Sequence, residues 1–142
     1  MIFTGFGSSH FRSRCSVNNT ITIIKTNSNS VFGGYVSIAW GWQTNNNGGD
    51  FNSFLFSIRR NGTEDIRTFK NGGSQDRSST YNINNNPMYG PSFGFQANDL
   101  KIVSYSNRFA SSTSNLGYTF QLPEECTYNS KGSAASHLLG VH

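Results

Sequence analysis

Charged residues, cysteines and long apolar runs are all scarce in this chain of 142 residues. Charged residues make up only 13%, so the polar surface has to be built mainly from Asn, Ser, Thr and Gly, which favour turns over helix interiors. No apolar run approaches the length that spans a membrane, and the N-terminus lacks the apolar region of a signal peptide. We therefore expect a cytoplasmic chain of strands joined by polar loops, without a transmembrane segment.

The two cysteines, Cys15 and Cys126, lie far apart and form no C-x-x-C motif. None of the three histidines stands at zinc-ligand spacing from them. Two cysteines do not build a disulfide framework in a chain of this length. These observations favour a reduced, intracellular protein, and we expect neither a metal nor a cofactor.

The net charge of +4 suits an acidic partner. The basic residues are scattered, however, and a nucleic-acid groove usually interleaves clustered basic residues with exposed aromatics. The composition therefore indicates a mildly basic, solvated surface and disfavours nucleic-acid binding.

Aromatic residues are abundant, with twelve Phe and six Tyr, and they bury much area per residue. Apolar, β-branched segments recur between turn signals, without a linker or a tandem repeat, which is typical of an antiparallel sandwich. We expect a mostly β protein with short helices, folded as one two-sheet β-sandwich domain over residues 1–142. The rings, among them Phe32, Phe54, Phe56 and Phe93, are expected to meet between the two sheets. The expected strands are 20–26, 31–40, 51–60, 66–70, 79–83, 99–105 and 117–122, with the remnant of a strand at 2–6.

The segments between these strands carry their own signals. A short helix is expected over 10–15, with Ser8 or Ser9 as its N-cap and Phe11 and Cys15 on one face. Residues 41–50 read as a loop, Asn61-Gly62 as a turn, and 89–95 as a corner rich in Gly, Pro and rings.

Several motifs, in this order, resemble a TLDc domain. The first are Phe11-x-x-x-Cys15, the run TITIIKT, and Phe32-Gly33-Gly34-Tyr35 leading to Trp40. The later ones are Phe54-Leu55-Phe56-Ser57-Ile58, Gly90-Pro91-Ser92-Phe93-Gly94 followed by Asp99, Asn115-Leu116-Gly117-Tyr118, and Leu138-Leu139-Gly140.

The resemblance implies a sandwich of two antiparallel sheets and kinship with the eukaryotic oxidation-resistance proteins. Members of that family protect against oxidative damage, and several bind the vacuolar proton-pumping ATPase. Relative to the family pattern, the chain looks incomplete at both termini, and a missing closing strand would leave an unpaired sheet edge. We expect such a domain to be less stable than a complete one, or to pair that edge with another chain.

Cys15 and Cys126 are candidates for a redox or hydrolytic enzyme, which is the alternative function, but Cys15 with Phe11 on one helix face favours a core contact. The adjacent pairs Glu64-Asp65 and Glu124-Glu125 are expected in turns, where they are solvated rather than catalytic. Asp99 is expected to accept backbone N–H groups and to lock the adjacent corner.

The glycine motifs have two readings as well. Gly33-Gly34 and the glycines of 90–94 could bind an anion through their N–H groups. Alternatively, they let aromatic rings pack closely against the backbone, and Gly33-Gly34 could also form a β-bulge. The motif does not match a phosphate-binding loop, so packing is favoured. The favoured function is a non-catalytic protein-interaction domain, with polar loops and exposed rings such as Trp42 as contact surfaces.

Overall fold

Strands dominate the part of the chain that the computed structural model describes, which comprises residues 8–41, 47–72, 83–86, 88–94, 99–104, 112–114 and 116–121. The elements are α1 (Ser8–Cys15), β1 (Thr20–Lys25), β2 (Val31–Val36), β3 (Asn47–Gly48), β4 (Phe54–Arg60), β5 (Thr63–Phe69), β6 (Ile83–Asn84), β7 (Tyr89–Phe93) and β8 (Leu100–Val103).

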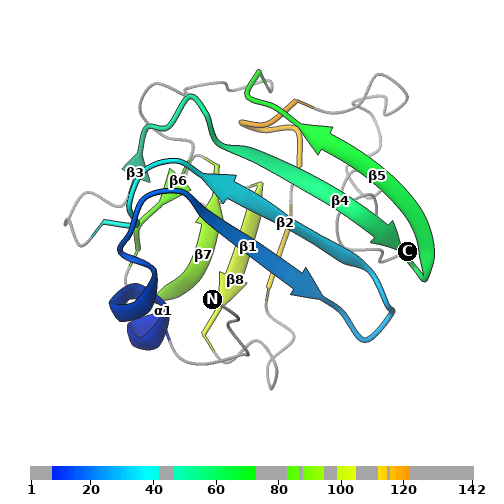
Figure 1. The fold of residues 1–142 in the computed structure, drawn as a ribbon, viewed down its shortest axis with the longest axis horizontal. Coiled ribbons are helices and arrows are strands. Elements are labelled where there is room, and N and C mark those ends of the chain that lie inside the picture. The colour runs from blue at the N-terminus through cyan, green and yellow to red at the C-terminus, as the bar shows by residue number, and fades with distance from the viewer. Residues whose placement is uncertain are drawn as a thin grey trace.

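The strands form two four-stranded antiparallel sheets (Figure 1). Sheet 1 has the order β1-β2-β4-β5, and sheet 2 has the order β3-β6-β7-β8. Sheet 1 lies nearer the viewer in Figure 1, and α1 packs against β7 of sheet 2. The expected mostly β, two-sheet sandwich is confirmed.

The first helix and the first strand of the chain form close to where the sequence predicts them. The helix α1 begins at Ser8, so both serines expected as N-caps lie within it. β1 is β-branched at five of its six positions, and its side chains alternate between half-buried and exposed. The strand expected at 2–6 lies outside the described residues.

β2 is shorter than expected, because it ends at Val36 and not at Trp40. The Ser37 N–H and Oγ donate to the two carboxylate oxygens of Asp50, each at 2.6 Å. The Asp50 carboxylate thus accepts the Ser37 N–H, which a longer β2 would have donated to a neighbouring strand. The expectation for residues 37–40 was wrong for this reason.

A tight hairpin joins β4 and β5 at the predicted Asn61-Gly62 turn. Both turn residues have positive φ, 48° at Asn61 and 84° at Gly62, which is the geometry of a type I′ turn. β5 begins at Thr63, three residues before the expected start, because this tight turn lets pairing begin at once with Arg60 opposite Thr63.

Sheet 2 departs from the expectations in two places. The expected loop 41–50 contains β3, whose residues pair with β6. The expected corner 89–95 contains a strand, β7, paired with β6 and β8. Pro91 lies in the register irregularity between Tyr89 and Ser92, where its missing N–H removes no regular ladder bond. Of the expected strand 79–83, Ile83 belongs to β6, and the rest lies outside the described residues.

The last expected strand, 117–122, is not formed by its described residues, 117–121. Phe120 makes an isolated bridge with Asn71. The side-chain carboxylate of Asp99 accepts the N–H groups of residues 117–120. Residue 122 lies outside the described residues. The expectation was wrong because the sequence does not show that a buried carboxylate competes for this backbone.

The core lies between the two sheets and is rich in rings. An edge-to-face series runs from Phe11 to Trp40 at 5.1 Å, on to Phe93 at 5.5 Å and then to Phe120 at 6.4 Å between centroids. These rings join α1, the segment that follows β2, β7 and the 116–121 segment. The buried apolar residues are Phe11, Phe32, Val36, Trp40, Leu55, Phe69, Ile83, Phe93, Leu100, Ile102, Leu116 and Phe120.

Candidate functional site

Asp99 is fully buried, and its carboxylate serves as the anchor of one chain segment. Oδ1 accepts the backbone N–H groups of four consecutive residues, 117–120, at 3.1–3.2 Å. Oδ2 accepts the N–H of Thr119 at 2.8 Å. Asp99 therefore accepts backbone N–H groups as expected, but the donors come from this distant segment and not from the adjacent corner.

Gly94 fits against this carboxylate. Its φ is +89°, and a Cβ at this position would overlap Oδ2 of Asp99 and lie 2.9 Å from its Cγ. Burial raises the pKa of Asp99 from 3.8 to about 6, while the backbone N–H donors oppose the rise. With both oxygens engaged by backbone, this carboxylate is placed as a structural anchor.

Asp50 is a second buried carboxylate, and sequence reasoning gave it no role. It is 3% exposed, binds Ser37 through both oxygens, and accepts the N–H of Asn52 at Oδ1 at 3.1 Å. The Asp50 carbonyl oxygen accepts the Ser53 Oγ–H at 2.8 Å. The signal was available in Asp50-Phe51-Asn52-Ser53, because Asp commonly starts an Asx-type turn in which its side chain accepts the N–H two residues on. Asp50 thus ties the end of β2 to the start of β4.

Cys15 lies half-buried at the end of α1 and packs against the core beside the Phe11 face. Burial raises the pKa of its thiol above 9.0, which reduces the thiolate fraction at neutral pH. This environment differs from that of reactive cysteines, which have lowered pKa values. Cys126, the other redox candidate, and Trp42, the proposed contact ring, lie outside the described residues.

Gly34 and the motif rings Phe32 and Phe93 lie on the inner side. A Cβ on Gly34 would lie 2.5 Å from Cε1 of Phe93 and 3.0 Å from Leu55 Cδ2, so only glycine lets this ring approach sheet 1. Gly90 is also close-packed, since its Cβ would lie 3.3 Å from the Ile102 carbonyl oxygen. Of the two readings of these glycines, the geometry matches ring and backbone packing.

Tyr35, Phe54 and Phe56 lie on the opposite side of sheet 1, although we expected the two Phe rings to meet the core between the sheets. β4 is apolar on both of its faces, so its alternation did not reveal which side is buried: Leu55 and Ser57 are buried, and Phe54 and Phe56 are only partly covered. The expectation that Phe54 and Phe56 pack with Phe32 and Phe93 was wrong.

We call the side of sheet 1 that points away from sheet 2 the outer face. The strand register arranges its side chains in three rows that cross the strands. The first row is Ile21, Tyr35 and Phe54; the second is Ile23, Gly33, Phe56 and Thr68; the third is Lys25, Val31, Arg59 and Glu64. Two rows are thus largely apolar, and the third carries charge.

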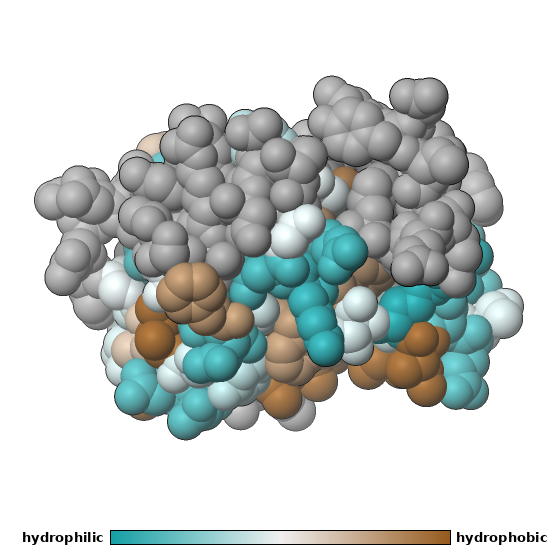
Figure 2. Space-filling view, turned by 90° about the horizontal axis from the view of Figure 1, so that it is seen from above, coloured by the Kyte–Doolittle hydropathy of each residue, from teal (hydrophilic) through white to brown (hydrophobic). Residues whose placement is uncertain are grey.

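The apolar rows of the outer face are accessible to solvent. Ile21 is 59% exposed and Ile23 is 63% exposed, and the Tyr35 and Phe54 rings lie 5.2 Å apart between centroids. A Cβ on Gly33 would lie 2.9 Å from Cζ of Phe56, so that ring covers bare backbone. In Figure 2, seen from above, hydrophobic residues recur among hydrophilic ones along the lower margin, where sheet 1 lies.

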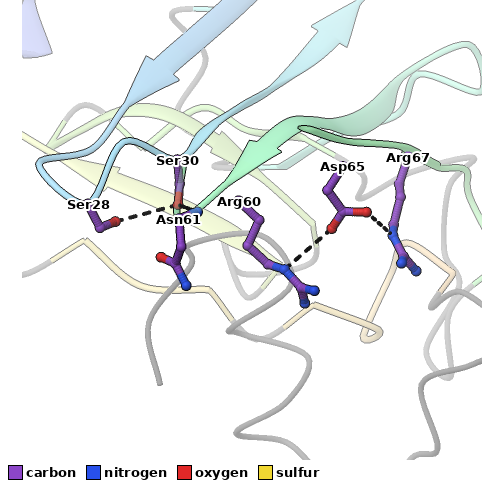
Figure 3. Close-up of polar contacts among 6 residues, drawn as sticks. All are labelled: Ser28, Ser30, Arg60, Asn61, Asp65 and Arg67. Atoms are coloured by element: carbon purple, nitrogen blue, oxygen red, sulfur yellow. Dashed lines mark hydrogen bonds and ion pairs between the residues drawn. The ribbon is translucent and has the colours of Figure 1, made fainter. Parts of the chain in front are cut away.

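An arginine pair shares one carboxylate at the β4–β5 hairpin (Figure 3). Arg67 Nε lies 2.7 Å from Asp65 Oδ1, and Arg60 Nε lies 3.4 Å from Oδ2. The expectation that Asp65 is simply solvated was therefore wrong. Two cations around one partly buried anion leave this edge with a net positive charge. Nearby, Ser30 Oγ accepts the Asn61 N–H at 3.0 Å and fixes the turn against the β1–β2 loop.

Among the residues that the structure describes, no group of three or more His, Cys, Asp or Glu side chains is arranged to hold a metal ion. No described helix is long and apolar enough to cross a membrane.

Comparison with known proteins gave one positive result. The family model described as the TLDc domain matches residues 4–135, which is nearly the whole chain. Neither the curated proteins nor the solved structures contain a match.

Proposed function

The chain belongs to the TLDc domain family, and from this membership we propose that it is a non-catalytic protein-interaction domain in the protection of eukaryotic cells against oxidative damage. The proposed partner is the vacuolar proton-pumping ATPase, which the family resemblance suggests. The proposal places the domain in the cytoplasm, as one folded unit over residues 1–142.

The observation that carries the proposal is the outer face of sheet 1. Large apolar side chains such as Ile21 and Ile23 remain exposed there, although hydrophobic residues make up only 35% of the chain. An apolar surface of this kind, bordered by charge, is typical of a protein-interaction site.

The buried polar groups support a non-catalytic role for the described part of the chain. The oxygens of Asp99 hold backbone N–H groups, and those of Asp50 hold Ser37 and Asn52. The thiol of Cys15 has a raised pKa. A nucleophile or a general base needs a group that is accessible and activated, and these three groups are placed differently.

The test is direct binding of the whole chain to purified vacuolar ATPase, measured by biolayer interferometry. We expect saturable binding that bovine serum albumin in place of the ATPase does not reproduce. Absence of binding would remove the ATPase as the partner. Peroxide consumption by wild type, Cys15→Ser and Cys126→Ser is the companion assay: activity that disappears with one thiol would favour the enzyme and overturn the non-catalytic proposal.

A further inference from the structure

We propose that the outer face of sheet 1 docks an amphipathic helix of a protein partner, with acidic residues on the helix placed over Lys25 and Arg59. This inference rests on the proposed function and deepens it, because it names the surface and the chemical class of the segment that the domain recognises.

The apolar rows have the dimensions of a helix footprint. β1, β2 and β4 lie side by side, so the face is about 10 Å wide at roughly 4.8 Å between strands. From Ile21 to Lys25 it extends about 13 Å along the strand at roughly 3.3 Å per residue. A helix is about 10 Å across and rises about 16 Å in three turns, so one short helix covers both apolar rows.

A helix is also the element that this side of the sandwich lacks. A sheet face with apolar side chains is buried in folded proteins by a second layer, either a sheet or helices. The inner side of sheet 1 has sheet 2, whereas α1 packs against β7, on the other sheet. Of the described elements, none therefore supplies a second layer for the outer face.

The positive charge of the third row indicates that the partner helix carries acidic residues. The third row carries the cations Lys25 and Arg59, and its one acidic residue is Glu64. Neither cation has a carboxylate within ion-pair distance among the described residues. A partner with carboxylates at one end of its apolar stripe would complement this row, as interface potentials usually do.

The probes are two synthetic 18-residue helical peptides with the same stripe of leucines at i, i+3, i+4 and i+7. One carries Glu on its polar face, and the other carries Lys. Binding to the whole chain is measured by fluorescence anisotropy at low and physiological salt. We expect the acidic peptide to bind at least fivefold more tightly, with a preference that shrinks as salt rises. Equal binding of the two peptides would overturn the proposal.

Two double variants test the face itself. Ile21→Ser with Ile23→Ser should weaken binding of the acidic peptide tenfold or more. Lys25→Glu with Arg59→Glu should reverse the preference, so that the basic peptide binds better. A reversal is a gain of binding, which a merely misfolded variant would not show. The matched control is Arg14→Glu with Lys101→Glu, two cations away from this face, and it should keep the preference of wild type. Loss of the preference in this control would overturn the assignment to the face.

Other occupants of the face give distinct outcomes. Vesicles of phosphatidylcholine with phosphatidylserine that bind wild type but not the isoleucine variant, while neither peptide binds, would overturn the proposal in favour of a membrane. A concentration-dependent dimer in sedimentation, abolished by the isoleucine variant, would overturn it in favour of a second copy.

The proposed function and this inference can fail separately. If the vacuolar ATPase binds wild type and both double variants equally, the proposed partner stands and the outer face is not its docking surface. If the acidic peptide binds as expected and the ATPase does not, the face stands and the partner is wrong.

Discussion

The interior of the sandwich and the outer face of sheet 1 use similar side chains in opposite ways. In the interior, rings are fully packed: Phe32 is 1% exposed and Phe93 is 0% exposed. On the outer face, isoleucines on β1 remain more than half exposed, and the cations of the third row lack carboxylate partners in the described part of the chain.

The polar groups show the same contrast. Asp99 engages four consecutive backbone N–H groups in the interior. The buried Ser57 Oγ is an exception, because it has no hydrogen-bond partner within the described part of the chain. Buried polar groups are costly when unpaired, so the interior is built to satisfy them. A surface that leaves apolar and charged groups exposed is under no such constraint. The difference indicates that the interior maintains the fold, whereas the outer face is available for binding.

The largest expected effect comes from a ring in the interior. Phe93→Ala removes a side chain that contacts Trp40 and Phe120 and fills the space over Gly34, so it should lower the free energy of unfolding by about 3–5 kcal/mol. Urea denaturation followed by tryptophan fluorescence measures the change. The matched control is Phe51→Ala, since Phe51 is 70% exposed and its loss should cost less than about 0.5 kcal/mol. Similar losses for both variants would contradict the division into an interior and an exposed surface.

A smaller effect should come from the titration of Asp99. Its folded-state pKa is raised to about 6, above the ordinary 3.8, so the folded protein binds a proton that the unfolded chain has released between these two values. The contribution of this group to stability is therefore fully present below about pH 3.8 and is lost as pH rises through about 6. We expect wild type to gain roughly 1–3 kcal/mol relative to Asp99→Asn when the pH falls from 7 to 4.

Urea midpoints of the two proteins at half-unit pH steps provide the measurement for Asp99. Subtracting the curve of Asp99→Asn isolates the contribution of Asp99. Parallel curves would show that Asp99 has the same affinity for protons in the folded and unfolded states. A relative loss of wild-type stability on acidification would show that the backbone donors outweigh burial.

Local signals in the sequence predicted the parts of the fold that depend on neighbouring residues. β1 followed from its β-branched run, the hairpin from Asn61-Gly62, and α1 from Phe11 and Cys15 at helical spacing. Each of these features depends on residues close together in the chain, which is why periodicity and turn chemistry were sufficient to find them.

The errors arose where residues distant in the sequence compete for backbone groups. Asp50 ends β2, and Asp99 engages the segment expected as the last strand. Side-chain periodicity also failed for β4, where apolar residues occur on both faces, so Phe54 and Phe56 could not be assigned to the outer face. The docking surface was missed for that reason: its rows form only when the register of three strands is known.

The smallest expected effect on stability comes from a substitution on the outer face. It is also the most direct test of the contrast between the packed interior and the exposed outer face. Ile23→Ser replaces a side chain that is 63% exposed, so it should change the free energy of unfolding by less than about 0.5 kcal/mol. Ile24→Ser is the matched control on the same strand, because Ile24 packs against the core and should cost clearly more. Thermal and urea denaturation of the two variants provide the comparison. If Ile23→Ser were as destabilising as Ile24→Ser, the outer face would be part of the fold's own packing. A stable Ile23→Ser protein would instead show that the folded chain does not depend on this isoleucine for its stability, as expected of a side chain outside the core.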